Sequence, residues 1–199
     1  MDPAETTYRE IPFNSTSADD RAAVLHLLGE EVWTKLEALR ARRVTGRSAR
    51  LLMRVFGELL VHRRNAYLQE ELVGAAPRRR RFFGRLEIDL TAVEASAGGD
   101  ALVMEVLAAT RGAVEELRRE VAETPARRAR LAASLGAVVG KENVRTDPFT
   151  LVAHATDATD WRLFLPVAVV MPDEERQVAP LLEAIAGLLP VDSGAIRSR

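Results

Sequence analysis

Three side chains in the last third of the chain carry atoms that could bind a metal ion: His154, Asp157 and Asp160. They follow one another at three-residue intervals and offer one imidazole and two carboxylates, which are metal-compatible groups. No further ligand accompanies them in this stretch, which is interpreted as a loop. We therefore predict no metal site here.

Other groups capable of acid–base chemistry have simpler explanations. Asp19 and Asp20 could form a carboxylate pair, but they follow Ser17 at the start of an expected helix, where acids satisfy free amides and favour the helix dipole. His26 is flanked by leucines, which is typical of a structural or surface histidine. The sequence contains no Ser-His-Asp order, P-loop or zinc-ligand spacing. No catalytic residue is predicted.

Clustered arginines are the remaining chemical signal. Arg78 to Arg81 could hold phosphates bidentately, and the following Phe82 and Phe83 could stack on bases. We favour a different interpretation, in which the arginines form a solvated helix start and the two phenylalanines enter the core. The groups at 62–64 and 42–50 are interpreted as helix ends, with a docking surface for a partner domain as the alternative.

Composition limits the classes of protein that the chain can belong to. The 199 residues include 28 basic and 29 acidic side chains, so the net charge of −1 gives no overall field that favours nucleic acid or an acidic membrane. With no cysteine, the segment has no disulfide, thiolate nucleophile or iron–sulfur ligand. The start at Met1 to Glu5 lacks the features of a signal peptide, and no apolar run is long enough to span a membrane. A cytoplasmic location is expected.

Apolar residues recur at helical spacing over residues 17–139, which predicts six or seven helices. Gly29, Gly46 and Gly98-Gly99 are expected to separate helices, and Pro77 is expected to begin one. Thr124-Pro125 is expected to end one helix and start another that reaches Val139. The helices are expected at 18–28, 30–43, 48–61, about 67–73, 78–96, 101–121 and 125–139.

From residue 144 onward the pattern changes. Asp147-Pro148 predicts a turn, and the β-branched run from Val167 to Val170, bounded by prolines, predicts a buried strand. Acids at 173–175 are expected to begin a helix that reaches about Leu188, and Pro190-Val191 is expected to begin a second strand. With that stub as its only neighbour, the 167–170 strand would present an open edge and could self-associate.

The order of these C-terminal motifs resembles the FAD-linked oxidases. Leu135–Gly140, Asp147-Pro148, His154–Asp157 and the Pro166–Asp173 run, of the form Pro-x-Ala-Val-Val-x-Pro, look like the entry into their FAD domain. These flavoproteins are of the D-lactate and glycolate dehydrogenase type, with a p-cresol-methylhydroxylase-like FAD domain. The resemblance implies an α+β domain that binds FAD and oxidises a 2-hydroxy acid. The resemblance places Val169, Val170 and Pro172 in the first strand of that FAD domain, with Pro172 at the end of the strand.

The front of the chain resembles a second element of the same proteins. The segments at 8–14, 17–21 and 43–51 look like the uncharacterised helical domain that precedes the FAD domain in some large bacterial FAD-linked oxidoreductases. Those proteins usually carry a later iron–sulfur region, so the resemblance implies the FAD and iron–sulfur domains as partners. The resulting division has an extended arm at 1–16, a helical domain at 17–140, the start of a FAD domain at 141–191 and a divergent tail at 192–199.

The tail departs from the family. Where the resemblance implies a Gly-rich loop, roughly Pro-Arg-Gly-x-Gly-Thr, that holds the FAD pyrophosphate, the chain reads Asp192 to Arg199. The fold class expected is therefore mainly α, with the first β/α unit of a truncated FAD domain, and the purified chain is expected to be colourless, without catalysis of its own. The alternative is a stand-alone helical module that binds protein or nucleic acid through its arginines.

Overall fold

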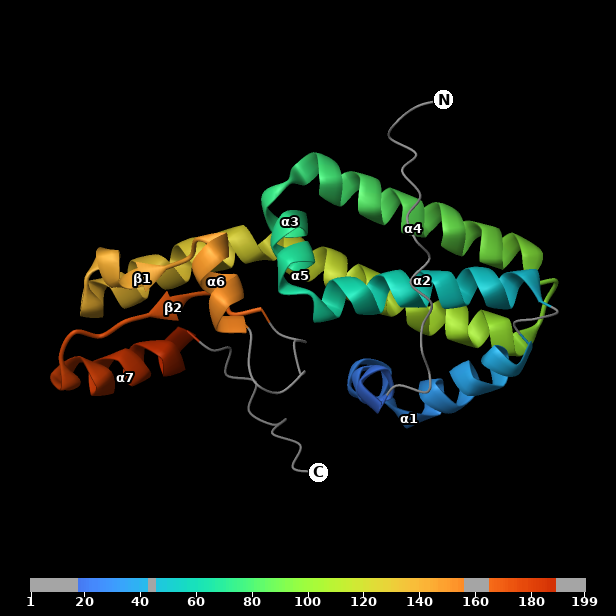
Figure 1. The fold of residues 1–199 in the computed structure, drawn as a ribbon, viewed down its shortest axis with the longest axis horizontal. Coiled ribbons are helices and arrows are strands. Elements are labelled where there is room, and N and C mark those ends of the chain that lie inside the picture. Colours follow the sequence, from blue (N-terminus) through green and yellow to red (C-terminus); the bar gives the residue numbers. More distant parts are fainter. Residues whose placement is uncertain (1–17, 43–45, 156–164, 189–199) are drawn as a thin grey trace. The chain divides into compact units, whose positions relative to one another are not determined.

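The structure is a computed structural model that describes residues 18–42, 46–155 and 165–188 (Figure 1). The described chain is mainly helical with one two-stranded sheet, which confirms the mainly α fold class. Its contacts divide it into two units, one reaching Ala122 and including Ala155 and Leu165, the other made of Glu123–His154 and the residues from Pro166 on. The predicted arm at 1–16, the strand at Pro190-Val191 and the tail at 192–199 lie outside the described residues.

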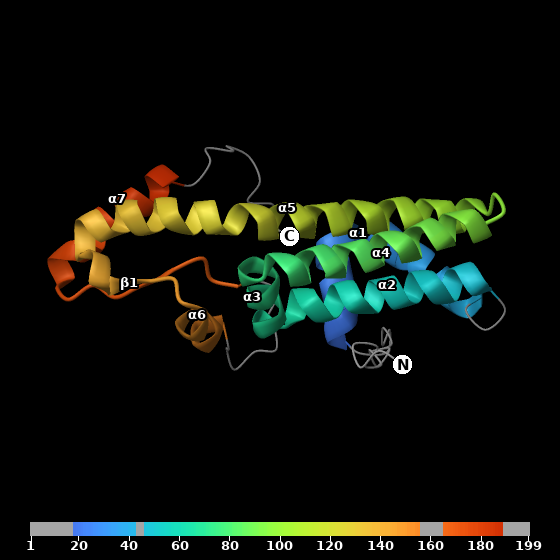
Figure 2. The same ribbon diagram turned by 90° about the horizontal axis from the view of Figure 1, so that it is seen from above.

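The first unit is built around helix α2. It contains α1 (Ala18–Arg42), α2 (Arg47–Arg64), α3 (Ala66–Gly74), α4 (Ala76–Ser96) and the first part of α5 (Ala101–Val139). Helices α2 and α4 run side by side (Figures 1 and 2), and α1 and α3 also contact α2. Eleven of the eighteen residues of α2 are buried, so it is the central helix of this core.

The helix boundaries follow local signals in the sequence. Gly29 has φ 81° and ψ 170°, a conformation that only glycine adopts readily, and it breaks α1 as predicted. Pro77 lies in the first turn of α4, also as predicted. The side chain of Asn65 accepts a hydrogen bond from the Leu68 amide at 3.1 Å and caps α3. After the glycine turn at 98–99, Asp100 caps α5 through the Leu102 amide.

The predicted break at Thr124-Pro125 is wrong. Helix α5 continues through Pro125 from Ala101 to Val139. A proline removes one backbone hydrogen bond and can cost about 3 kcal/mol inside a helix. Leu117 and Val121 are buried before the proline, and Leu135 and Val139 are buried after it. This burial stabilises helical backbone on both sides, so the proline does not end the helix.

The second unit combines the end of α5 with short elements. They are the 3-10 turn η1 (Lys141–Asn143), β1 (Val144–Arg145), α6 (Pro148–Ala155), β2 (Val169–Val170), η2 (Glu175–Gln177) and α7 (Val178–Leu188). β1 and β2 pair antiparallel, with Val144 opposite Val170 and Arg145 opposite Val169. The predicted strand at 167–170 is thus confirmed for its last two residues.

The expectation that Pro190-Val191 would be the only neighbour of this strand is wrong, because β1 occupies one of its edges. The Met171 amide extends the pairing by donating to the Asn143 carbonyl at 3.0 Å. β1 has two residues and directly follows η1, so it shows no alternating pattern that would predict it. In the described part of the chain, none of the helices is long and apolar enough to cross a membrane.

Substitution of Gly29 by alanine should destabilise the protein by about 1–3 kcal/mol, because its φ and ψ are costly for any residue with a Cβ atom. The matched control is Gly112→Ala, at an exposed helical position of α5 where a Cβ meets no neighbour within 4 Å. That control should stabilise the protein by about 0.5–1 kcal/mol. Chemical denaturation measures both changes. Equal effects of the two substitutions would mean that Gly29 does not adopt this conformation.

Candidate functional site

The residues that the flavoprotein resemblance singles out lie together at the end of β2. Val169 and Val170 form the strand and are half-buried, whereas Pro172 is exposed in the turn that follows. Val170 and Ala168 pack on a small core of Leu135, Val139, Val144 and Leu181. The core joins the end of α5, both strands and α7 within the second unit. Val169 and Val170 therefore have a structural role in the strand pair, and Val170 also packs on the core.

Two amide side chains hold this turn in place. Gln177 accepts hydrogen bonds from the backbone amides of Asp173 at 2.9 Å and Glu174 at 3.1 Å. Asn143 donates to the Asp173 carboxylate at 2.6 Å and to the Val139 carbonyl at 2.9 Å. The reciprocal contact between Glu174 and Gln177 is a capping box. We refer to Asn143, Asp173, Glu174 and Gln177 as the turn clamp.

The clamp connects the end of α5 to the start of α7. Asn143 binds the last turn of α5 through Val139, and Gln177 comes within 3.5 Å of the Val138 carbonyl. The acids at 173–175 were expected to begin this helix, and Glu174 does so. The roles of Asn143 and Gln177 were missed. The sequence did contain a signal for the role of Gln177, because a Gln three residues after an N-cap residue such as Glu174 fits a capping box.

His154 lies on helix α6 and not in the loop that was expected. Its Nδ1 is 2.8 Å from the Thr150 carbonyl, one helical turn earlier. Asp147 caps this helix through the Thr150 amide at 3.0 Å, and that hydrogen bond lowers the pKa of the Asp147 carboxyl. Asp157 and Asp160 lie outside the described residues. Within the described ranges, no group of three His, Cys, Asp or Glu side chains is placed to hold a metal ion.

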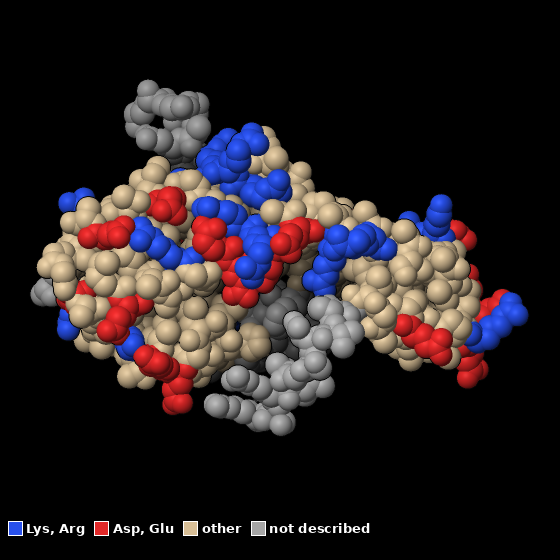
Figure 3. Space-filling view, turned by 180° about the vertical axis from the view of Figure 1, so that it is seen from behind, with Lys and Arg blue, Asp and Glu red and all other residues tan. Residues whose placement is uncertain are grey.

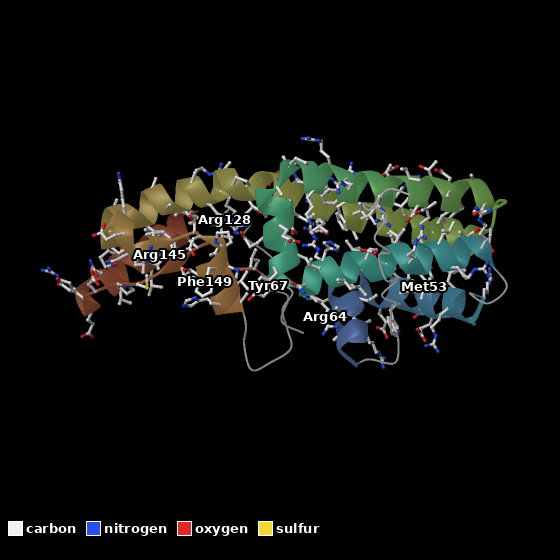
Figure 4. The ribbon with its side chains drawn as sticks, turned by 45° about the horizontal axis from the view of Figure 1, so that its top comes forward. Met53, Arg64, Tyr67, Arg128, Arg145 and Phe149 are labelled. Atoms are coloured by element: carbon white, nitrogen blue, oxygen red, sulfur yellow. The ribbon has the colours of Figure 1, made fainter. Side chains whose placement is uncertain are left out.

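Helix α6 was itself not predicted, although Asp-Pro at its first positions is a recognised start signal. Leu151 and Val152 are buried on one side of it, and Phe149 is 81% exposed on another. Figure 4 labels Phe149 together with Arg145 of β1, which is also exposed. The second unit thus presents a large aromatic side chain and a guanidinium to solvent.

In the first unit, polar side chains are buried where α2 meets its neighbours. His62 is 4% exposed, and its Nδ1 lies 2.8 Å from the Glu58 carbonyl. A carbonyl oxygen can only accept, so Nδ1 carries the hydrogen. Burial lowers the pKa of His62, which favours the neutral ring. Burial raises the pKa of the nearby Glu58 carboxyl, against the opposing effect of Arg85 and Arg54.

Arg63, next to His62, is buried and forms an ion pair with Glu120 of α5. Its backbone carbonyl also accepts a hydrogen bond from Gln69 at 2.6 Å. A buried guanidinium without an acidic partner would cost several kcal/mol. The arginine group at 62–64 is therefore partly internal and is not a free basic surface.

The two phenylalanines after the arginine run enter the core, as predicted. Phe82 is 7% exposed and its ring centroid lies 4.0 Å from that of His62. Phe83 is 4% exposed, with the Arg118 guanidinium 5.1 Å from its ring centroid. Rings covered in this way are not available to stack on bases.

The remaining sequence candidates either have roles in the structure or the surface of α1, or lie outside the described residues. Trp33 is buried, with the Arg21 guanidinium 5.7 Å from its ring centroid, whereas His26 is exposed on α1. The side chains of Asp19 and Asp20 lie outside the described residues.

Comparison with known protein families gives a match over the first part of the chain. The family described as "Protein of unknown function (DUF3683)" matches residues 6–119, more than half of the chain. The chain belongs to this family. Neither the comparison with curated proteins nor that with solved structures found a match. The DUF3683 match covers α1 to α4 and the first part of α5, and it ends before residue 141, where the sequence predicted the start of a FAD domain.

Replacement of Gln177 by alanine should destabilise the second unit by about 1 kcal/mol, because the Asp173 and Glu174 amides lose their acceptor. Amide hydrogen exchange should accelerate at residues 173 and 174. The control is Glu175→Ala, an exposed neighbour in the same turn, which should leave this exchange unchanged. Unchanged protection in the Gln177 variant would contradict the clamp.

The DUF3683 region should lose stability as the pH falls below about 6.5, the ordinary pKa of histidine. Above that pH, His62 is neutral in both folded and unfolded chains. Below it, the unfolded chain binds a proton that the buried ring resists, so unfolding becomes more favourable until the lowered folded pKa is reached. Chemical denaturation at pH values between 7.5 and 5.5, on either side of the ordinary histidine pKa, measures this loss of stability.

The His62→Gln variant should show a smaller loss over this range. Glu58→Gln should show a larger loss, because the raised pKa of Glu58 acts in the opposite direction. A His62→Gln variant with the same pH dependence as the original chain would rule out His62 as its source.

Proposed function

We propose that this chain is the N-terminal part of a FAD-dependent oxidoreductase that resembles D-lactate and glycolate dehydrogenases. In this proposal the DUF3683 region is an accessory docking domain, and residues 141–191 begin the FAD-binding domain. The whole flavoprotein would oxidise a 2-hydroxy acid and transfer a hydride to the flavin. Its FAD and iron–sulfur domains would be the partners of the DUF3683 region.

The observation that supports the proposal is the strand–helix unit that β2 and α7 form on one small core of the second unit. Helix α5 ends at Val139 and is followed by η1, β1, the Asp147-capped α6, β2, the turn at Pro172, η2 and α7. A strand followed by a helix that shares its core is also the repeating element of α/β layers.

The described residues of this unit do not by themselves fit the FAD pyrophosphate. The turn after β2 carries Asp173, Glu174 and Glu175, whose negative charges repel phosphate. Gly140, which has φ 90°, has the Glu142 carboxylate 2.6 Å from the position of an added Cβ, so it does not leave an open cradle for an anion. The proposal therefore gives Val169, Val170 and Pro172 a scaffold role and assigns them no contact with the cofactor.

Self-association through residues 167–170 stays a prediction, but only one edge of the strand is now open to a second chain. Because β1 takes one edge of β2, a second chain could pair only with the other edge. Nucleic acid is a less suitable partner than the arginine count suggests. Basic and acidic side chains are interspersed over much of the face in Figure 3, which weakens any extended positive field.

A segment exchange tests the proposal. In a flavin-containing oxidase of the glycolate dehydrogenase type, the first strand–helix segment of the FAD domain would be deleted and then replaced by residues 141–188 of this chain. Deletion should abolish flavin retention, because the domain loses part of its sheet and core. Replacement should restore about one flavin per chain, measured by visible absorbance after gel filtration.

The control replacement carries Val170→Asp, which places a charge against the core of Leu135, Val139, Val144 and Leu181 in the original unit. It should not restore flavin. A folded replacement protein that stays colourless with the original segment would contradict the proposal.

A further inference from the structure

A proline weakens the backbone hydrogen bonding in the middle of α5. The helix runs from Ala101 to Val139, and Pro125 lies inside it. Because proline has no amide hydrogen, it cannot donate to the Val121 carbonyl four residues earlier, as other residues of a helix do. Its ring also crowds that carbonyl. The backbone of α5 is therefore held less firmly between Val121 and Pro125 than along the rest of the helix.

Packing does not compensate for this loss around the proline. From residue 122 to residue 134, Arg128 is the one buried side chain, and the others are exposed or half-buried. The buried apolar residues of α5 before this stretch end at Val121, and those after it begin at Leu135. A segment with few buried apolar contacts deforms at low free energy. The weakest hydrogen bonding of α5 thus coincides with its least packed part.

The two ends of this stretch belong to different cores. Val121 packs in the core of the first unit, whereas Leu135 packs in the core of the second. The division of the chain by its contacts also falls here, between Ala122 and Glu123. A change in the direction of α5 between Val121 and Leu135 therefore leaves both cores intact.

Glycine, the other residue type that weakens helices, is supported by packing in α5. Gly112 is followed by the buried Ala113 and Val114. Gly136 is itself buried, and Lys141 lies 3.3 Å from the position of a Cβ added to it. The stretch around Pro125 has no comparable apolar cover.

We propose that Pro125 is a hinge at which α5 bends. Prolines are a recognised cause of bends in helices, and hinges absorb their change of angle in a few residues. The turns of α5 that follow Pro125 move together with β1, β2 and α7, because Leu135 shares a core with Val144 and Leu181. The hinge is thus a conformational device that redirects this strand–helix unit as one piece. The inference does not depend on the proposed flavoprotein.

Distances between spin labels on α5 test the hinge in the full chain. The chain has no cysteine, so labels attach only to cysteines that are introduced. One pair, Arg119→Cys with Ala137→Cys, spans Pro125. The reference pair, Ala101→Cys with Arg119→Cys, lies before it. All three positions are exposed, and both pairs are 18 residues apart. This separation is five helical turns, or about 27 Å, so the labels of each pair lie on one side of α5.

Pulsed electron paramagnetic resonance measures the distribution of distances for each pair. Because a proline permits bends of more than about 20°, the pair that spans it should give a distribution at least about 1.5 times as wide as that of the reference pair. Pro125→Ala restores an amide donor for the Val121 carbonyl and should narrow this distribution to the width of the reference. Gly112→Ala, the matched control in α5, should leave both widths unchanged. Circular dichroism verifies that each variant is folded.

Three results would overturn the inference. Equal widths for the two pairs would show that α5 does not bend at Pro125. A wide distribution that persists in Pro125→Ala would place the motion elsewhere in the helix. A narrow distribution whose mean shifts in Pro125→Ala would show a fixed kink instead of a hinge.

Discussion

Burial of α2 is the constraint on which the first unit depends. Leu52, Val55 and Phe56 are fully buried in the centre of the helix, and each such side chain contributes about 1.5–3 kcal/mol. Because α1, α3 and α4 all contact α2, the core fixes which face each neighbour presents inward. The same packing leaves His62 and Arg63 inside the protein, where the Glu58 carbonyl and the Glu120 carboxylate satisfy them. The exposed face of α4 exists because its other side, with Phe82, Phe83 and Leu86, completes this core.

The second unit relies more on polar contacts. Its core has four buried residues, Leu135, Val139, Val144 and Leu181, and the strands have two residues each. Short strands contribute few backbone hydrogen bonds, so Asn143 and Gln177 have a large share in joining α5 to the β2–α7 turn. Helix α7 carries a single charged residue, Glu183, and leaves Leu182 exposed. A helix that is apolar on more than one side is typically covered by another element.

The sequence predicted most helices because their apolar residues recur at helical spacing and their ends carry glycine, proline or capping residues. Gly29 and Pro77 are examples where the local chemistry alone decides the boundary. The continuity of α5 through Pro125 was not predictable in this way, since packing outweighs the local signal. β1 has no periodicity to recognise, and its pairing depends on residues 24 and 26 positions later in the chain. The structure was also needed to tell buried contacts of arginines from exposed ones. Arg79 and Arg80 are neighbours in one arginine run, but Arg79 donates to the Leu72 carbonyl and Arg80 is exposed.

Residue-level hydrogen exchange of the full chain tests most directly whether α2 is the centre of the structure. If it is, amides of α2 around Val55 and Phe56 should exchange only on global unfolding and should be the most protected in the protein. Amides of β1, β2 and α7 should open at lower free energy, because their core is smaller. Exchange in the middle of α2 as fast as in α7, under the same conditions, would contradict the central place given to this helix.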